Sequence, residues 1–132
     1  ANKHPRVNIL EPGIGVGGHC IPIDPLFISQ IAPQKSKIIK LARKINDNKP
    51  SSIAKQILSE LKNITNPNVV VGGISYKKNV NDIRESPALK IIEYLKTKNV
   101  KVTIYDPVVY PKTKSTLVAV NLVTSVARSI IS

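Results

Sequence analysis

Two short apolar segments on either side of an amphipathic stretch constrain the fold of this chain most. NVVVGGIS at 68–75 predicts a buried strand that ends in glycines, and KVTIYDP at 101–107 predicts a second strand. SPALKIIEYLKTK at 86–98 predicts the helix between them, because Ser86 suits the N-cap and Pro87 suits the first helical position. Parallel strands joined by a helix indicate a doubly wound α/β unit. The expected buried face of this helix consists of Ala88, Leu89, Ile92 and Leu95.

The predicted sheet is smaller than a usual doubly wound sheet. TLVAVNLV at 116–123 can form a third strand, whereas such sheets usually have about five or six. We therefore expect an α/β chain in which central helices precede an incomplete Rossmann-like parallel sheet, and a chain that stops in mid-domain. The expected segments are an N-terminal segment with the cysteine at 1–32, central helices at 33–66 and the Rossmann-like domain at 67–132.

The central segment has a helical pattern that a proline interrupts. The apolar residues Ile38, Leu41, Ala42 and Ile45 predict a helix that ends near 46–48, before Pro50. A second helix would then follow, or the two form one long helix kinked at the proline. The expected apolar face of the part after Pro50 consists of Ile53, Ile57, Leu58 and Leu61.

Residues 1–32, rich in proline and glycine, predict mostly loop, with a short strand at 6–10. Within them, Gly13, Gly15 and Gly18 match the dinucleotide pattern G-x-G-x-x-G. We reject a dinucleotide site here, because Pro22 and Pro25 prevent a long helix from starting after the glycines. An acidic residue about 20 positions further on is also missing from the sequence.

Cys20, the single cysteine of the chain, follows these glycines directly. A glycine-rich loop can present a thiolate for attack on a carbonyl, and Asp24 could then orient water or take a proton. From the residues alone, a small buried cysteine in a tight turn is the simpler interpretation. His19 beside it does not indicate zinc, because the chain has only two histidines and one cysteine, and we expect no metal.

The charge of the chain is strongly positive but gives little sign of nucleic-acid binding. Twenty basic residues against eight acidic give a net charge of +12, which attracts polyanions. Aromatic residues for base stacking are scarce, with one Phe and four Tyr, so we expect no nucleic-acid partner. No apolar run is long enough for a membrane span, and a single cysteine suits a cytoplasmic setting. The densest basic group is predicted to be a solvated helix face: Lys35, Lys37, Lys40, Arg43 and Lys44.

Three segments of the sequence resemble the UDP-glucose/GDP-mannose dehydrogenase family. They are ANKHPRVNILEPGIGVGGHCIPIDPLFI at 1–28, ARKINDNKP at 42–50 and GGISYKKNVNDIRESPALKI at 72–91. They resemble, in the right order, the catalytic-cysteine segment, the central helix and the UDP-binding domain of that family. The resemblance extends over residues 1 to about 107.

The resemblance implies oxidation of a nucleotide-sugar alcohol to a carboxylate, with two hydrides passed to two NAD molecules. Cys20 would capture the aldehyde as a thiohemiacetal and later carry a thioester, and Asp24 would assist its hydrolysis. The first segment favours UDP-N-acetylmannosamine, and UDP-glucose and UDP-N-acetylglucosamine are the alternatives. The resemblance also implies that Arg6 lies in a region that reaches a neighbouring subunit's substrate. The substrate-binding positions that it implies are Arg6, Leu10, Glu11, Gly17, Gly18, Tyr76, Lys77 and Arg84.

Two alternatives remain open at this stage. Arg84 can bind substrate or instead form a salt bridge with Asp82 or Glu85 that holds its loop. The chain can be the substrate side of the enzyme or a non-catalytic UDP-sugar-binding or dimerisation module.

NAD is expected to bind mainly to an N-terminal domain absent from this sequence, so we expect this chain alone to be inactive. A homodimer is expected through the central helices.

Overall fold

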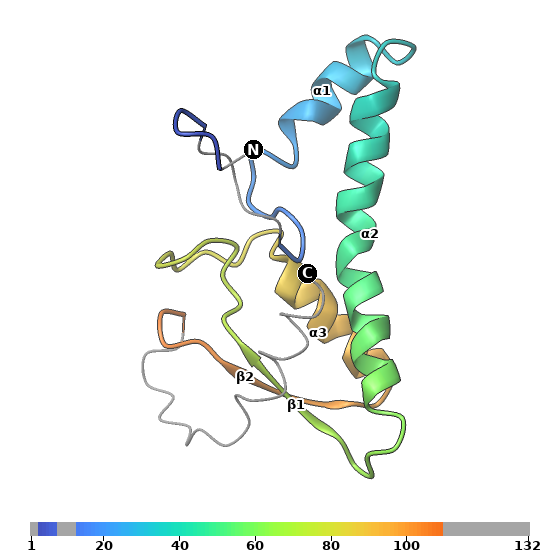
Figure 1. The fold of residues 1–132 in the computed structure, drawn as a ribbon, viewed down its shortest axis with the longest axis vertical. Coiled ribbons are helices and arrows are strands. Elements are labelled where there is room, and N and C mark those ends of the chain that lie inside the picture. Colours follow the sequence, from blue (N-terminus) through green and yellow to red (C-terminus); the bar gives the residue numbers. More distant parts are fainter. Residues whose placement is uncertain (1–2, 8–12, 110–132) are drawn as a thin grey trace.

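The computed structural model describes residues 3–7 and 13–109. Helix α1 (Asp24–Ile31) is followed by the long helix α2 (Lys37–Glu60), strand β1 (Asn68–Gly72), helix α3 (Pro87–Thr97) and strand β2 (Lys101–Tyr105). Figure 1 shows α1 beside one end of α2, whereas α3 and the two strands lie beside the other end. The predicted third strand at 116–123 lies outside the described residues.

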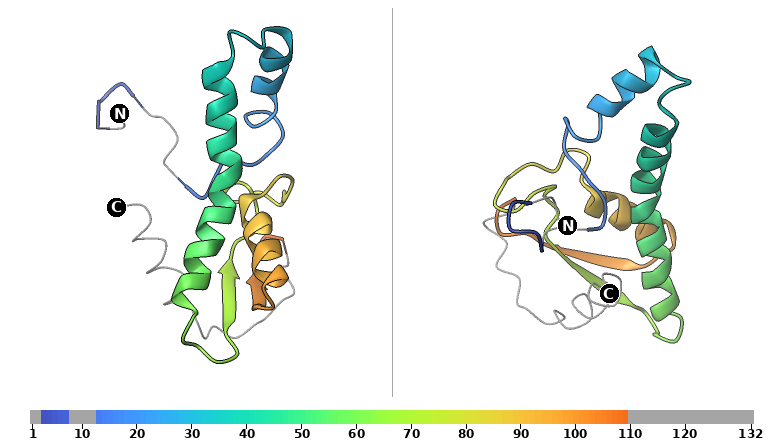
Figure 2. Two further views of the ribbon diagram at one scale, coloured as in Figure 1. Left: turned by 90° about the vertical axis from the view of Figure 1, so that its right-hand side faces the viewer. Right: turned by 45° about the horizontal axis from the view of Figure 1, so that its top comes forward.

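The two strands are parallel and α3 connects them, which confirms the predicted β-α-β unit. The register pairs Asn68 with Lys101 and Gly72 with Tyr105, so both strands end at the same edge. The loop at 73–86 leaves that edge and leads into α3 (Figure 2). Residues that follow β1 and β2 therefore lie close together, and the site described below begins at this edge.

Helices α2 and α3 cover one face of the strand pair. The core between them consists of Ile53, Ala54, Val69, Ile91, Leu95 and Val100. On α3, Ile91 is buried in place of the predicted Leu89, which is only half-buried, while Ala88, Ile92 and Leu95 are buried as predicted. Ser86 is the N-cap residue, although its buried hydroxyl has no hydrogen-bond partner in the part of the chain that the structure describes.

The prediction that the central helix ends before Pro50 is wrong, and the alternative of one long helix is confirmed. Pro50 lies inside α2 and is buried there. Proline removes one helical hydrogen bond, at a cost of roughly 3 kcal/mol. The core contacts of Ile53 and Ala54, one turn later, stabilise the helix beyond this point.

The sequence does not predict helix α1, because Pro22 and Pro25 argue against a helix directly after the glycines. Pro25 is in the first turn of α1, where a missing amide hydrogen costs little. The predicted strand at 6–10 falls mostly outside the described residues, and Arg6 and Val7 are not in a strand. None of the helices in the described ranges is long and apolar enough to cross a bilayer.

Candidate functional site

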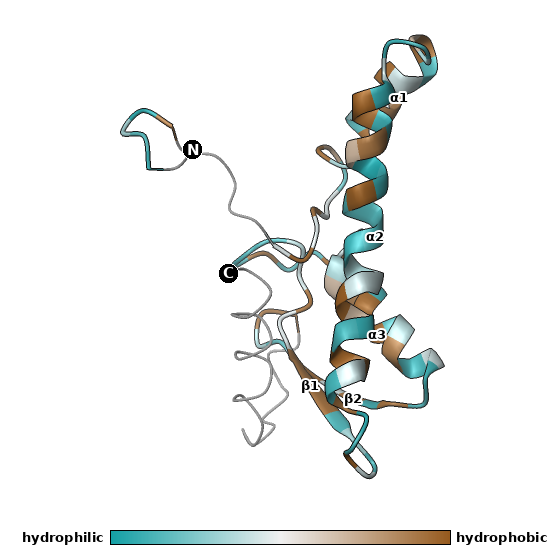
Figure 3. Ribbon diagram, turned by 45° about the vertical axis from the view of Figure 1, so that its right-hand side comes forward, coloured by the Kyte–Doolittle hydropathy of each residue, from teal (hydrophilic) through white to brown (hydrophobic). Residues whose placement is uncertain are grey.

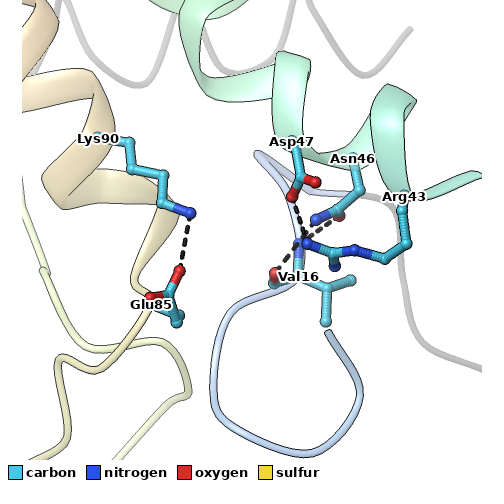
Figure 4. Close-up of polar contacts among 6 residues, drawn as sticks. All are labelled: Val16, Arg43, Asn46, Asp47, Glu85 and Lys90. Atoms are coloured by element: carbon cyan, nitrogen blue, oxygen red, sulfur yellow. Dashed lines mark hydrogen bonds and ion pairs between the residues drawn. The ribbon is translucent and has the colours of Figure 1, made fainter. Parts of the chain in front are cut away.

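The cysteine loop at 13–20 lies between α2 and the start of α3. The backbone amide of Val16 donates to Oδ1 of Asn46 over 2.7 Å, and Nδ2 of Asn46 donates to the Val16 carbonyl over 3.3 Å (Figure 4). On the other side, the amide of Gly18 donates to the carbonyl of Arg84 over 3.2 Å. The loop is thus attached both to the central helix and to the segment that leads into α3.

Gly17 and Gly18 are buried against that segment. A Cβ on Gly17 would lie 2.7 Å from the carbonyl oxygen of Glu85 and 2.9 Å from the Cβ of Tyr76. A Cβ on Gly18 would lie 2.9 Å from the Tyr76 ring, and its φ of +86° is in the left-handed region. Glycine is required at both positions because the two loops approach so closely.

These contacts argue against a pyrophosphate at Gly18, the last glycine of the G-x-G-x-x-G pattern. A pyrophosphate needs free backbone amides at the start of a helix, with open space in front of them. Here protein atoms occupy the space beside Gly17 and Gly18, and the Gly18 amide is already bonded to Arg84. The chain then turns before α1 begins at Asp24.

The thiol of Cys20 is free and exposed. The Cys20 carbonyl accepts hydrogen bonds from the amides of Ile23 and Asp24 at 3.0 and 2.9 Å, which form the turn into α1. The structure thus shows an accessible thiol, in contrast to the buried cysteine that the residues alone suggested. Asp24 is the first residue of α1 and is also exposed.

A cavity of about 940 Å³ joins the cysteine loop to the loop after β1. It brings Gly17, Gly18 and Cys20 together with Tyr76 and Lys77, which come much later in the sequence. Of the candidates that the structure describes, Arg6, Asp24 and Arg84 do not line it. Leu10 and Glu11 lie outside the described residues.

Arg84 forms the ion pair that was one of its two predicted alternatives. Its guanidinium donates to both carboxylate oxygens of Asp82, with distances of 2.6 to 3.0 Å. These hydrogen bonds, together with one from the Arg84 amide, lower the pKa of Asp82 to about 2. Glu85 is paired with Lys90 at 2.9 Å instead. Arg84 remains largely exposed. Its hydrogen bonds to Asp82 and the charge of that carboxylate raise the pKa of the guanidinium, and a negative charge on Tyr76 or Cys20 would add a smaller increase.

Asp106, directly after β2, holds the start of the loop that carries Tyr76 and Lys77. Its carboxylate accepts a hydrogen bond from the amide of Ile74 at 2.8 Å, and the Ser75 hydroxyl lies 3.4 Å away. The amides of Val108 and Val109 bind its other oxygen at 2.9 and 3.0 Å. Burial opposes the charged form, but these backbone hydrogen bonds outweigh it and lower the pKa of Asp106.

Sequence reasoning did not single out Asn46, Lys49 or Asp106. Asn46 and Lys49 line the cavity together with Ala42 and Ile45, all from α2. A carboxamide on a helix gives no signal that it will bind a loop 30 residues earlier in the chain. A signal for Asp106 was available, since polar residues that follow parallel strands gather at one edge of the sheet. In the described part of the chain, no three side chains of His, Cys, Asp or Glu are grouped so that they could hold a metal ion.

Comparison with known proteins identifies the family. Residues 1–48 match the central domain of the UDP-glucose/GDP-mannose dehydrogenase family, and residues 70–131 match its UDP-binding domain. The chain belongs to this family. The resemblance inferred from the three sequence segments is therefore confirmed.

Individual members of the UDP-glucose/GDP-mannose dehydrogenase family are similar over most of this chain. UDP-N-acetyl-D-mannosamine dehydrogenase of Methanococcus vannielii is 55% identical over 109 residues, which are 81% of this chain and 25% of the relative. The enzyme of the same name from Campylobacter jejuni is 47% identical over 108 residues, 81% of this chain and 26% of that protein. The chain thus spans about a quarter of the length of these curated relatives.

Solved structures of the family share the fold. UDP-D-ManNAc dehydrogenase from Pyrococcus horikoshii superposes with a TM-score of 0.72 at 41% identity, over 81% of this chain and 27% of that one. A UDP-glucose dehydrogenase from Pyrobaculum islandicum superposes with a TM-score of 0.68 at 26% identity, over 76% of this chain and 24% of that one. The predicted α/β fold class, with helices and a parallel strand pair, is confirmed.

Proposed function

We propose that this chain supplies the nucleophilic thiol and the nucleotide-sugar contacts of an NAD-dependent dehydrogenase that oxidises UDP-N-acetylmannosamine to its uronate. The observation that carries the proposal is the shared cavity, in which an exposed thiol faces the same space as Tyr76 and Lys77. The names of the most similar relatives support this choice of sugar. UDP-glucose and UDP-N-acetylglucosamine remain the alternatives, and a non-catalytic UDP-sugar-binding module is the alternative from another class.

The proposed chemistry of this chain centres on the sulfur of Cys20. The thiolate adds to the aldehyde carbon of the substrate, which forms a C–S bond and a thiohemiacetal. Once that adduct has been oxidised to a thioester, water attacks the acyl carbon, the C–S bond breaks and the thiolate is regenerated. Asp24 is our proposed assistant for the water step. It lies three positions beyond Ile21, the last residue of this segment that lines the cavity, so α1 or the turn before it must approach the thiol.

The binding side of the proposal rests on charge and shape. Lys77 lines the cavity and supplies a cation for a diphosphate, and the Tyr76 ring covers the glycine loop. Arg84 lies just outside and would retain its Asp82 partner while it attracts the substrate. Arg6, Leu10 and Glu11 stay in the proposal as further contacts. NAD is the proposed acceptor of both hydrides.

Protection of Cys20 by substrate tests this function directly, because a chain with a single cysteine carries the label at one position only. We expect UDP-N-acetylmannosamine to slow alkylation by iodoacetamide, and K77A to reduce that protection. K62A, an exposed lysine after α2, is the matched control and should leave the protection unchanged. Unchanged alkylation at saturating substrate would rule out the proposed role of Cys20. Equal protection by UDP-glucose would instead overturn the choice of sugar.

A second copy of this chain is the proposed partner. Large apolar side chains on α1 and on the first half of α2 are exposed. In Figure 3 the hydrophobic residues of both helices are coloured brown. Ile38, Ile45 and Leu41 are 83%, 61% and 57% exposed and lie on one side of α2. A self-complementary apolar stripe is the usual basis of a two-fold homodimer.

A further inference from the structure

We propose that Asn46 is a positioning residue, which holds the cysteine loop where the thiol of Cys20 can react. The consequence for Cys20 rests on the proposed function. The two hydrogen bonds between Asn46 and Val16, called the clamp from here on, can be tested without substrate. Asn46 is half-buried in the middle of α2, four positions before Pro50. It is thus on the element that also forms the core with α3.

The carboxamide of Asn46 satisfies both backbone groups of a single loop residue. It accepts from the Val16 amide at 2.7 Å and donates to the Val16 carbonyl at 3.3 Å, as a neighbouring strand would (Figure 4). Val16 is four residues before Cys20, and Gly17 and Gly18 between them are in contact with Tyr76. Any movement at Val16 is therefore transmitted to the thiol and to the wall of the cavity.

The backbone around Asn46 also allows the loop to come close. Pro50 has no amide hydrogen, so the Asn46 carbonyl lacks the helical donor that it would have in an uninterrupted helix. A Cβ on Gly15 would lie 3.5 Å from that carbonyl oxygen and 3.4 Å from the ring of Pro87. The loop thus passes between α2 and the start of α3, and Asn46 is the side chain of α2 that is hydrogen-bonded to it.

Hydrogen exchange followed by mass spectrometry tests the clamp on the complete chain. We expect N46A to speed exchange in the peptide 13–20 about tenfold, because two hydrogen bonds to Val16 are lost. Exchange in the α3 peptide 87–97 should stay unchanged, which separates loss of positioning from general destabilisation. The matched control is N48D, at an exposed asparagine two residues further along the same helix. An unchanged loop peptide in N46A would overturn the inference.

The variant N46D adds a chemical rescue that a purely structural role would not produce. A carboxylate at this position can accept from the Val16 amide but repels the Val16 carbonyl, whereas a protonated carboxyl can make both hydrogen bonds. We expect fast loop exchange at pH 7 and a return toward the wild-type value, compared at the same pH, as the pH is lowered to 4. The charged and titratable groups around this turn come from four elements, and all variants share them: Arg43, Asp47 and Lys49 of α2, His19 and Cys20 of the cysteine loop, Tyr76 and Lys77 of the loop after β1, and Glu85 before α3. Exchange in N46D that matches N46A at every pH would contradict the inference.

Alkylation of Cys20 links the clamp to the thiol. We expect protection by UDP-N-acetylmannosamine to fall several-fold in N46A and to stay at the wild-type value in N48D. A loosened loop with unchanged protection would show that Asn46 does not position the thiol. If wild-type Cys20 itself is not protected, the proposed function fails, while the exchange experiment still decides whether the clamp exists.

Discussion

Gly17 and Gly18 show how single residues determine the shape of this site. Both lie where the cysteine loop touches the loop after β1, and both have protein atoms within 3 Å of the position of a Cβ. Backbone atoms are among the neighbours of Gly17, so the conflict cannot be relieved by rotation of a flexible side chain. The site therefore requires residues without a side chain at positions 17 and 18.

Gly17→Ala should displace the cysteine loop. We expect a loss of about 1–3 kcal/mol in the free energy of unfolding, since the overpacked methyl meets the Glu85 carbonyl at 2.7 Å. Urea denaturation of the variant measures this loss. Gly13→Ala is the matched control in the same loop, because a Cβ there meets nothing within 4 Å. Equal stability of the two variants would show that the loops are not packed as described.

The pairing of Asp82 with Arg84 makes a prediction about pH. The pKa of Asp82 is lowered from 3.8 to about 2, so the stabilisation from this pair is present above pH 3.8 and is lost as the pH falls toward 2. Carboxyl NMR titration should give a midpoint near 2 for the wild type. In R84Q the midpoint should return toward 3.8, whereas K78Q, at another cation of the same loop, should leave it near 2. A wild-type midpoint near 3.8 would mean that the pair does not persist in solution.

At the scale of elements, the end of β2 and the start of the loop after β1 are joined by one buried side chain. Asp106 is 5% exposed, and both of its oxygens accept backbone hydrogen bonds. The joint determines where the loop leaves the sheet, and Tyr76 follows only two residues after Ile74. The parallel strands bring these positions together because both end at the same edge.

Asp106→Asn should weaken this joint. A carboxamide presents a donor to one of the two sets of amides whichever way it is turned, so we expect a loss of about 2 kcal/mol in the free energy of unfolding. Because the pKa of Asp106 is lowered, its contribution is lost as the pH falls below its ordinary range, and the variant should therefore be less sensitive to acid. Urea denaturation at pH 7 and in acid measures both effects. Glu60→Gln, at the exposed end of α2, is the control and should change stability by less than about 0.5 kcal/mol.

At the scale of the whole molecule, one end is packed and the other is exposed. The core lies where α2 and α3 cover the strands, whereas α1 and the first half of α2 have exposed apolar side chains. Both of these helical segments contain hydrophobic residues, coloured brown in Figure 3. Phe27 and Ile31 of α1 are 59% and 85% exposed. Apolar surface of this kind on a helix is typical of an interface.

We expect the chain to sediment as a dimer at micromolar concentration, with about twice the monomer mass of 14.4 kDa. I38E introduces a charge into the exposed stripe and should shift the equilibrium toward monomer. I64E, at an exposed apolar position after α2, is the matched control and should leave the dimer intact. A wild-type mass that stays near 14.4 kDa across this range would contradict the proposed interface.

From the sequence alone we could predict the β-α-β unit, the start of α3 at Ser86 and Pro87, and membership of the dehydrogenase family. These features depend on local periodicity, on capping and on contiguous motifs, all of which are properties of neighbouring residues. Local rules failed at Pro50 and at Pro25, where the cost of a proline depends on its place in a helix and on the packing around it.

Which distant residues are in contact became clear from the folded structure. Cys20 is exposed rather than buried in a turn, and Arg84 forms its ion pair with Asp82. The fold also brings Asn46 to Val16 across 30 positions of the chain, and Asp106 to Ile74 across 32. Such contacts depend on how the strand pair orients its loops and on how α2 crosses α3. A single sequence carries no local signal for either, because the interaction energy exists only once the elements have packed.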